Sequence, residues 1–501
     1  MRTRFTTLVL AAILSTATRG TSRTLGAQPR LTLDATRTVR DSRGGDGRAF
    51  TIVSAILGET RRIDVVFPAS FAASASTRRY PVMIVLDGES QTAPTAAVTD
   101  ELTRNGQMPE LLVVAIENTN RLRDLTPPGL SVSGSSMHEG GDVFLDFIEK
   151  ELLPEIDRQF RGAPPRVLVG HSSGAILATY AAATRGTYCC IIALDAPTHL
   201  GENWLANKLT ARAKAANAPL RYLSYEARFG WADDSWQALV AAAPKSWMLH
   251  HEKLPMESHE SMPMLGMYLG LKKTFSDYSM LSAPVAPTTS ILPYYDTINR
   301  SFGASGTEMS VIPPRKLLQD VVEDLLMEGR GAAARGAYEL QRSSYGAPAD
   351  ANEVLSQIAE TERRPAPTET VEALLATPFP TPAEARNIVG AWMGNVWMNE
   401  DELYPGKPPT VLRIVVKDGR VTGELESNPA PGVMQVQPLT YLRITPAGFT
   451  FGFMNGMRPR GVLLYEGTRT NGVLQGQVRF GGVSFVMPEG GGPIYFMFKK
   501  Q

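Results

Sequence analysis

Ser172 is the residue whose type and surroundings point most directly to chemistry. It lies in Gly-His-Ser-Ser-Gly, after the apolar run at residues 167–169 and before an alanine-rich segment. The pattern G-x-S-x-G is typical of a tight strand-to-helix turn that exposes a serine hydroxyl as a nucleophile. Gly170 and Gly174 supply the small residues that such a turn needs. A purely structural turn has the same pattern, so the partners of Ser172 must decide between the two interpretations.

A serine nucleophile needs a general base, and His259 is the best-placed histidine. Two of the six histidines, His250 and His251, fall within the predicted last strand, where their side chains point to opposite faces. His259 follows that strand in the polar loop Glu-Ser-His-Glu-Ser, as expected for a base at the carboxyl end of a sheet. His138 lies in a Gly/Ser loop and is a candidate for the pocket border.

A carboxylate must orient the base, and Glu226 is our choice because it ends the predicted strand at residues 220–227. Asp195, which follows the preceding strand, is the alternative acid, and Asp233 and Asp234 are further candidates. Two backbone N–H groups are expected to stabilise the oxyanion. One belongs to Ser173 at the start of the helix, and the other to Glu89, where Gly88 lets the chain turn.

These residues lie within a long segment in which strand-like and helical patterns alternate. Between about residues 48 and 275, buried apolar runs at residues 80–88, 111–118 and 166–171 are interspersed with helical spacing at residues 142–160 and 173–184. Such alternation predicts an α/β protein with a mostly parallel sheet and helices on both faces. The order serine, acid, histidine along the chain matches the α/β-hydrolase layout.

The rest of the chain changes character twice. Residues 316–363 have the spacing of two or three helices and resemble a tetratricopeptide-like hairpin, which must dock on a neighbour to bury its apolar face. Residues 387–501 are rich in short alternating runs, and Asp418-Gly419 and Asn471-Gly472 are hairpin signals. We expect an antiparallel, lipocalin-like barrel of roughly eight strands there.

We therefore expect a signal peptide and four further segments. The expected boundaries are a signal peptide at 1–27, the α/β-hydrolase domain at 28–282, a linker and helical hairpin at 283–363, a proline-rich linker at 364–386, and the barrel at 387–501. Basic Arg2 and Arg4 before a short apolar run predict cleavable export to the periplasm or medium. The apolar run is too short to span a bilayer.

The composition of the chain argues against several classes of partner and cofactor. The 50 lysine and arginine residues balance 50 aspartate and glutamate residues, which argues against a nucleic-acid partner. The only two cysteines, Cys189 and Cys190, are adjacent, so no disulfide framework is expected. No Cys/His cluster has metal-ligand spacing and no G-x-G-x-x-G follows a strand, so we expect neither a metal nor a nucleotide cofactor.

Five segments in fixed order resemble the bacterial family named Putative esterase. They are YPVMIVLDG, LLVVAIENTNRLRDLTPP, GGDVFLDFIEKELLPEIDRQF, VLVGHSSG and ESHESMP. The family includes siderophore esterases, feruloyl esterases and S-formylglutathione hydrolases, with mycolyltransferases as relatives. The resemblance spans roughly residues 45 to 275 and implies the α/β-hydrolase fold, with Ser172 as nucleophile, His259 as base and Glu226 as acid.

The resemblance also points to residues around the pocket. The pair Arg121 and Asp124 matches a loop that lies near the pocket in the family, although a structural salt bridge between them is the simpler interpretation. Trp204 follows a segment that lines the pocket in relatives, and here that segment departs from the family pattern. Ala175 stands where the family has a second glycine after the elbow.

Together these observations predict an exported serine carboxylic-ester hydrolase that forms an acyl-enzyme through Ser172, His259 and Glu226. The expected substrate is a small-molecule, glycan or siderophore ester. Acyl transfer to a sugar or lipid alcohol uses the same residues and is the alternative within enzymes. A binding protein that kept the scaffold is the alternative outside them.

Overall fold

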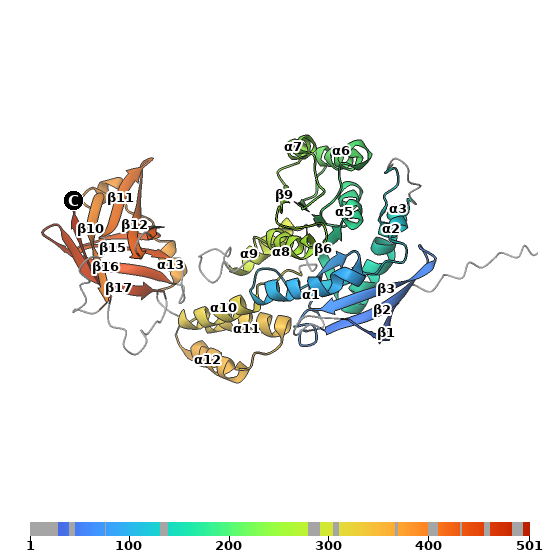
Figure 1. Cartoon of the computed structure of the whole chain (residues 1–501). Coiled ribbons are helices and arrows are strands. Elements are labelled where there is room, and N and C mark those ends of the chain that lie inside the picture. The colour runs from blue at the N-terminus through green and yellow to red at the C-terminus, as the bar shows by residue number, and fades with distance from the viewer. Residues whose placement is uncertain are drawn as a thin grey trace, which may run out of the picture.

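The computed structural model describes most of the chain from residue 29 onward (Figure 1). The described residues are 29–39, 46–75, 77–130, 139–278, 291–303, 310–365, 369–398, 409–430, 433–454, 461–482 and 494–501. The predicted signal peptide and the candidate pocket residue His138 lie outside these ranges. In the described part, no helix is both long and apolar enough to cross a membrane.

A nine-stranded sheet forms the centre of the first domain. Its strands are β1 (Leu31–Thr38), β2 (Asp46–Ser54), β3 (Glu59–Phe67), β4 (Tyr80–Val85), β5 (Leu112–Ile116), β6 (Gly162–His171), β7 (Cys190–Leu194), β8 (Leu220–Glu226) and β9 (Trp247–Lys253). The spatial order is β1-β2-β3-β5-β4-β6-β7-β8-β9. The strands from β5 to β9 in this order pair in parallel, whereas β1, β2 and β3 join the edge antiparallel.

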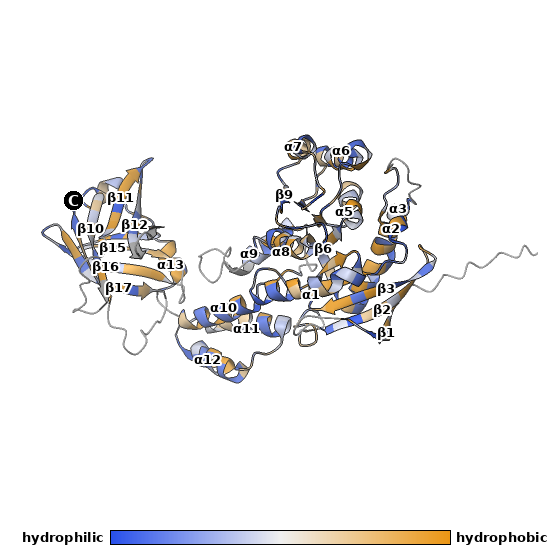
Figure 2. Ribbon diagram, viewed as in Figure 1, coloured by the Kyte–Doolittle hydropathy of each residue, from blue (hydrophilic) through white to orange (hydrophobic). Residues whose placement is uncertain are grey.

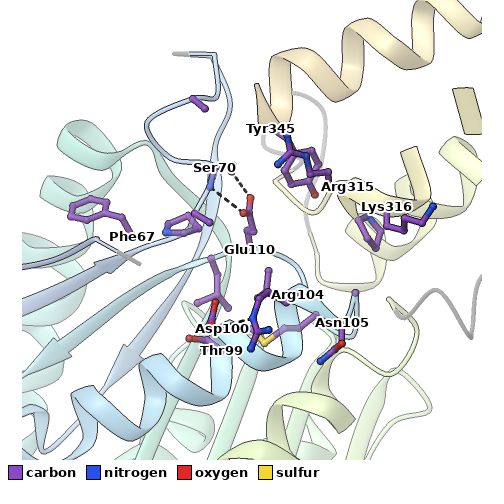
Figure 3. Close-up of a pocket in the computed structure, with 18 of the residues that line it drawn as sticks. Phe67, Ser70, Thr99, Asp100, Arg104, Asn105, Glu110, Arg315, Lys316 and Tyr345 are labelled. Atoms are coloured by element: carbon purple, nitrogen blue, oxygen red, sulfur yellow. Dashed lines mark hydrogen bonds and ion pairs between the residues drawn. The ribbon is translucent and has the colours of Figure 1, made fainter. Parts of the chain in front are cut away.

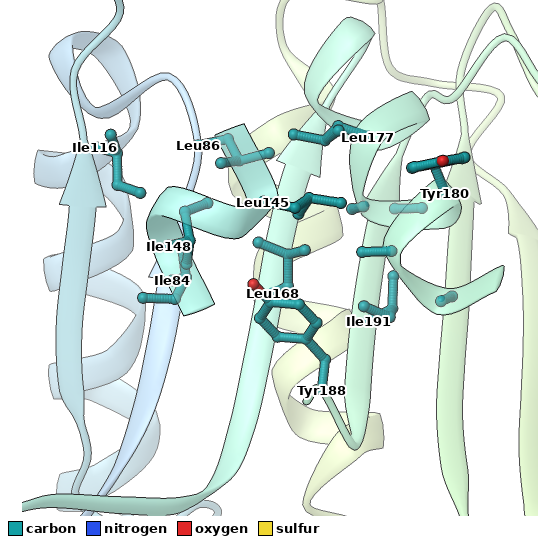
Figure 4. Close-up of a cluster of buried hydrophobic side chains, with 14 of the residues drawn as sticks. Ile84, Leu86, Ile116, Leu145, Ile148, Leu168, Leu177, Tyr180, Tyr188 and Ile191 are labelled. Atoms are coloured by element: carbon teal, nitrogen blue, oxygen red, sulfur yellow. The ribbon is translucent and has the colours of Figure 1, made fainter. Parts of the chain in front are cut away.

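Helices cover both faces of this sheet. They are α1 (Gly88–Arg104), α2 (Arg121–Leu125), α3 (Gly141–Phe147), the π-helical turn η1 (Ile148–Leu152), α4 (Leu153–Phe160), α5 (Ser173–Thr184), α6 (Leu200–Lys214), α7 (Asp233–Ala242) and α8 (Met262–Thr274). Successive strand residues point to opposite faces, so Leu168 joins the core under α3 and α5 while Val167 and Val169 join the core under α1 and α8. Figure 4 shows the first of these cores, with Leu168 between Leu145 and Ile191.

The strand order reverses between β4 and β6. After β4 the chain forms β5 on one side, and then crosses to form β6 on the other side of β4. In open α/β sheets such a switch point leaves a crevice at the carboxyl ends of the two strands, where ligands bind. Ser172 follows β6 and Glu89 lies just after β4, so the fold brings both predicted site residues to this edge.

A helical unit follows the α/β domain, and we use this name for α9 (Ile291–Ser301), α10 (Arg315–Met327), α11 (Gly331–Tyr345) and α12 (Ala351–Arg363). Figure 2 shows that α10 to α12 contain both hydrophobic and hydrophilic residues. Their apolar residues, such as Leu317, Val321 and Tyr338, are buried in the same core as α1 and α8. The expected docking of the helices on a neighbour is therefore observed, and residues 315–363 form three helices, within the expected two or three.

The C-terminal part forms a second, all-antiparallel sheet preceded by α13 (Val371–Leu375) and α14 (Pro382–Ala385). Its strands are β10 (Gly390–Met398), β11 (Thr410–Lys417), β12 (Arg420–Ala430), β13 (Val433–Pro438), β14 (Tyr441–Thr445), β15 (Gly448–Met454), β16 (Val462–Thr470), β17 (Val473–Gly481) and β18 (Ile494–Lys500). The order is β13-β12-β11-β10-β18-β17-β16-β15-β14. Figure 1 shows the helical unit between the two sheets.

This second sheet curls into a half-barrel. Its two edge strands, β13 and β14, are consecutive in the chain, and Leu439 and Thr440 connect them. The N–H of Leu439 donates to Gly423 on β12, and the N–H of Thr440 donates to Gly452 on β15. The predicted antiparallel architecture is confirmed, but the sheet has nine strands where about eight were expected, and its edge strands are linked by this short connection.

Candidate active site

Ser172 occupies a left-handed turn between β6 and α5. Its φ of 57° and ψ of −118° are rare for a residue with a side chain and place it on the sharp bend expected of a nucleophile elbow. Gly170 makes the bend possible, because a Cβ there would lie 2.2 Å from the backbone of Gly174. The N–H of Ser172 donates to Leu194 on β7 (2.9 Å), which fixes the turn to the sheet. Ala175 stands where the family has a second glycine after the elbow, and its small side chain is fully buried there.

His259 lies in the loop between β9 and α8, and its Nδ1 is 2.5 Å from Oδ2 of Asp195. The His259 side chain is 19% exposed, whereas that of Asp195 is fully buried. The His259 ring lies 4.5 Å from the ring of His171, the residue before Ser172, and the ring of Phe229 packs edge-on at 5.2 Å. Because Nδ1 faces the carboxylate, Nε2 is the nitrogen left to exchange a proton with a substrate or with Ser172.

Ser172 and His259 make no hydrogen bond with each other in the part of the chain that the structure describes. Catalytic hydrogen bonds are often long without substrate and tighten in the substrate complex. Burial lowers the pKa of His171, and the nearby His259 adds to the effect, so the His171 imidazole is neutral at neutral pH. The contact between His171 and His259 was not foreseen from the sequence.

Asp195 is held by one loop. It follows β7 with a φ of 52°, and its Oδ1 accepts hydrogen bonds from the backbone N–H groups of Ala227, Arg228 and Phe229 at 2.7, 2.9 and 2.8 Å. Burial alone would raise the pKa of Asp195. The hydrogen bonds from His259 and from the three N–H groups outweigh burial, so its pKa lies below the ordinary value. The carboxylate is therefore ionised at neutral pH.

Glu226, which was chosen as the acid from the sequence, does not contact His259 in the described part of the chain; Asp195 does. Glu226 ends β8, which lies one strand farther from β6 than β7 does. Its Oε1 lies 2.5 Å from His251 Nε2 and accepts the N–H of Trp231, also at 2.5 Å. The sequence left Asp195 as the alternative, and the two could not be separated because each directly follows or ends a buried strand. Asp233 and Asp234, the further candidates, are exposed at the start of α7.

Two helices begin at the switch point, where β4 and β6 end. Asp87 precedes α1 with a φ of 59°, and Gly88 has no room for a side chain, since a Cβ would lie 2.9 Å from the backbone of Ile116. The first N–H groups of a helix have no intrahelical acceptor, so those of Glu89 and Ser173 are free to bind an anion. The Glu89 carboxylate itself is occupied, because it accepts both the N–H and the side-chain amide of Asn118.

Arg121 lies beside this site, but it does not pair with Asp124. Its Nε donates to Asp87 Oδ1 (2.6 Å) and its Nη2 to Asp87 Oδ2 (3.0 Å), while Nη1 reaches Ser173 Oγ at 3.3 Å. The hydrogen bonds to Asp87 raise the pKa of Arg121. Asp124 is buried and binds Arg61 (2.6 Å) and Arg123 (2.7 Å), a separate structural cluster. The expected Arg121–Asp124 pair is therefore not formed. Arg121 lies at the site, whereas Asp124 binds Arg61 and Arg123.

Trp204, the remaining pocket candidate, is half-buried on α6. Its ring stacks on Tyr180 of α5 with centroids 6.0 Å apart, and Lys208 lies over it. His199 before α6 stacks on Phe229, at 6.2 Å. Phe229, which contacts both His199 and His259, was missed by the sequence analysis, because nothing in its local pattern separates a site aromatic from a core one.

A cavity of about 670 Å³ lies elsewhere, between α1, the segment before β5, and α10 (Figure 3). Buried Glu110 lines it, held by the N–H of Ser70 (3.2 Å) and by Arg78 (3.0 Å). Glu110 precedes β5, so the cavity is at the amino end of the parallel strands, opposite to Ser172. None of the predicted site residues lines it. Within the described ranges, no cluster of three or more potential ligand side chains is placed to hold a metal ion.

A known protein family matches part of the α/β domain. Residues 54–246 match the family described as Putative esterase. The matched segment contains Ser172, Asp195 and Glu226 and ends before His259. The crystal structure of an IroE-like serine hydrolase from Shewanella oneidensis has a TM-score of 0.51 at 26% identity, over 59% of this chain and 99% of that one. The siderophore hydrolase EstB from Aspergillus nidulans has a TM-score of 0.40 at 18% identity, over 48% and 98%.

A curated relative carries no described activity. The Bacillus subtilis (strain 168) protein described as "Uncharacterized protein YbbA" is 28% identical over 127 residues, which are 24% of this chain and 50% of YbbA. The chain thus spans about half the length of this relative. The match to this family and the likeness to a serine hydrolase support an α/β-hydrolase fold for the first domain.

Proposed function

We propose that the protein is a serine ester hydrolase whose catalytic triad is Ser172, His259 and Asp195. The observation that carries the proposal is the 2.5 Å contact between His259 Nδ1 and the buried, ionised Asp195, beside the left-handed turn at Ser172. A carboxylate in this place holds the imidazole in one orientation and stabilises the imidazolium that forms during the reaction.

In the first half of the reaction, Ser172 Oγ attacks the ester carbonyl carbon while its proton moves to His259 Nε2. The carbonyl oxygen becomes an oxyanion, which accepts hydrogen bonds from the N–H groups of Ser173 and Glu89. When the intermediate collapses, the bond to the ester oxygen breaks and that oxygen takes the proton from His259. An alcohol leaves and the acyl group remains on Ser172.

In the second half, water attacks the acyl-enzyme and gives a proton to His259. Collapse of the second intermediate returns that proton to Ser172 and releases the carboxylic acid. Arg121 contributes by neutralising Asp87, because an unpaired carboxylate next to the elbow would oppose the developing negative charge.

A fluorophosphonate probe tests the proposal, since it phosphonylates a serine only where a base activates it. We expect the folded wild-type protein to be labelled at Ser172 and to hydrolyse short p-nitrophenyl esters. Ser172→Ala is expected to lose both labelling and turnover at an unchanged melting temperature. Ser356→Ala, an exposed serine on α12, serves as the matched control. Labelling that persists in folded Ser172→Ala would sink the proposal.

A further inference from the structure

The loop at residues 227–231 connects β8 to α7 and performs two tasks at the site. Its first three N–H groups all donate to Oδ1 of Asp195, which leaves Oδ2 directed at His259. The third of these residues, Phe229, also packs its ring edge-on against the His259 imidazole. The conformation of this loop therefore determines how both Asp195 and His259 are oriented.

The Glu226 side chain binds the far end of the same loop, at Trp231. Its Oε1 accepts the N–H of Trp231 at 2.5 Å, so the carboxylate spans the loop from the last residue of β8 to Trp231, two residues before α7. Gly230 completes the turn against this carboxylate, since a Cβ there would lie 1.7 Å from the Glu226 carboxyl carbon. Thr198 Oγ1 donates to the carbonyl of Gly230 (2.7 Å) and ties the loop to the segment after Asp195.

His251 supports Glu226 from the neighbouring strand β9. Its Nε2 lies 2.5 Å from Glu226 Oε1, and its ring packs on Trp236 of α7 with centroids 5.0 Å apart. Only 8% of the Glu226 side chain and 11% of the His251 side chain are exposed. The N–H of Trp231 and the His251 ring are thus the groups that lie against this buried carboxylate.

We propose that Glu226 is a positioning residue that acts on catalysis through Asp195, by holding the loop at residues 227–231 in the conformation that delivers three N–H groups to that carboxylate. The catalytic part of this inference rests on the proposed triad. In the described part of the chain, Glu226 makes no hydrogen bond or ion pair with His259 or Ser172. Any effect of Glu226 on catalysis must therefore pass through the loop and Asp195, whereas a triad acid would contact His259 directly.

Three variants and a control measure the effect on turnover. Glu226→Ala removes the acceptor for Trp231 N–H, and we expect kcat to fall by about 10- to 100-fold with KM within about 3-fold, as for other residues that orient a site ligand. Glu226→Gln keeps an oxygen acceptor and should retain most of kcat. Gly230→Ala displaces the carboxylate without removing it and should reproduce the loss. Glu252→Gln, an exposed carboxylate on β9, should behave as wild type.

A double-mutant cycle tests whether the effect passes through Asp195. We expect Asp195→Ala/Glu226→Ala to be no slower than Asp195→Ala alone, because an interaction already lost cannot be lost twice. If the two losses multiply, Glu226 acts independently of Asp195 and the inference is wrong. If Glu226→Gln is as inactive as Glu226→Ala while Asp195→Ala keeps its activity, Glu226 is the acid and the inference is equally wrong.

A measurement on the folded full chain that needs no turnover keeps the two proposals apart. With ¹⁵N-histidine labelling, the low-field proton between His259 and Asp195 should be visible in the wild type and absent in His259→Ala. We expect it to disappear or move in Glu226→Ala and Gly230→Ala and to stay in Glu226→Gln, with thermal unfolding confirming that each variant is folded. An unchanged resonance in both folded loop variants overturns the inference, even if Ser172 proves to be the nucleophile. The expected pattern without ester hydrolysis would overturn only the proposed function.

Discussion

At the scale of single residues, the geometry favours Asp195 over Glu226, the carboxylate chosen from the sequence. Both carboxylates are buried, but only Asp195 contacts His259 and accepts three backbone N–H groups. We expect Asp195→Asn to lower kcat by about 10³- to 10⁴-fold, because the amide no longer stabilises the imidazolium. Hydrolysis of a p-nitrophenyl ester checks this. Activity near that of the wild type would show that another group orients His259.

The same residue predicts a pH dependence of stability. The pKa of Asp195 is lower in the folded protein than in the unfolded chain, where it is about 3.9. Its contribution to the free energy of unfolding is therefore fully present above about pH 4 and is lost as the pH falls through the folded-state pKa. We expect Asp195→Asn to lower the melting temperature more at pH 7 than at pH 3, measured by calorimetry. An equal or larger loss at pH 3 would contradict the depressed pKa.

Arg121 is the other residue with a testable electrostatic role. Arg121→Ala leaves the Asp87 carboxylate unpaired beside Ser173, so we expect kcat to fall by roughly 10-fold, less than the about 10²- to 10³-fold typical of a lost oxyanion donor. Adding Asp87→Asn should restore part of the loss, since the unpaired charge is then gone. Steady-state kinetics of the single and double variants measure both effects. A double variant slower than Arg121→Ala would mean that Asp87 itself assists the reaction.

At the scale of elements, the turn between β6 and α5 depends on a glycine. A Cβ at residue 170 would lie 2.2 Å from backbone atoms of Gly174, and backbone cannot move aside as a side chain can. We expect Gly170→Ala to lower the free energy of unfolding by about 3 kcal/mol and to reduce labelling of Ser172. Gly186→Ala is the matched control, because a Cβ there meets no heavy atom within 4 Å. Equal denaturation midpoints for the two variants would refute this account.

The elements show why some of the site could be predicted and some could not. The β6–turn–α5 unit and the loop after β9 are local patterns, so Ser172 and His259 could be chosen from the sequence. The helix α1 was missed, because Gly88–Arg104 is rich in threonine and small residues and lacks an apolar stripe. The pairing of His259 with Asp195 depends on strand order and on the fold of residues 227–231, which are tertiary properties.

At the scale of the whole molecule, the helical unit completes the core of the α/β domain. Leu317, Val321 and Tyr338 are at most 2% exposed, and Arg78 of the α/β domain stacks on Tyr345 at 4.5 Å. We expect a chain that ends at residue 309 to aggregate, because it exposes this apolar surface. A chain that ends at residue 365 should stay folded and keep its ester hydrolysis. Size-exclusion chromatography and kinetics compare the two, and a monomeric, active 1–309 chain would show that the helices are dispensable.

The second sheet was predicted in type and in its turns. Asp418 and Gly419, and likewise Asn471 and Gly472, have positive φ and connect adjacent strands, as the hairpin signals indicated. Phe449 and Phe451 are fully buried, so both belong to the core. The curling of the sheet and the link between its edge strands could not be predicted. Alternation of apolar and polar residues indicates which face each residue occupies, but it does not identify distant strand partners.

The first and last strands of this sheet, β10 and β18, are neighbours. Trp392 pairs with Lys500, and the N–H of Gln501 donates to Ala391, so the chain enters and leaves the sheet at the same place. A unit whose two ends meet can be transplanted into a surface loop of an unrelated host without stretching the host chain, or given new termini by circular permutation. The curled sheet therefore has the geometry of a portable module, one that recombination could attach to different enzymes.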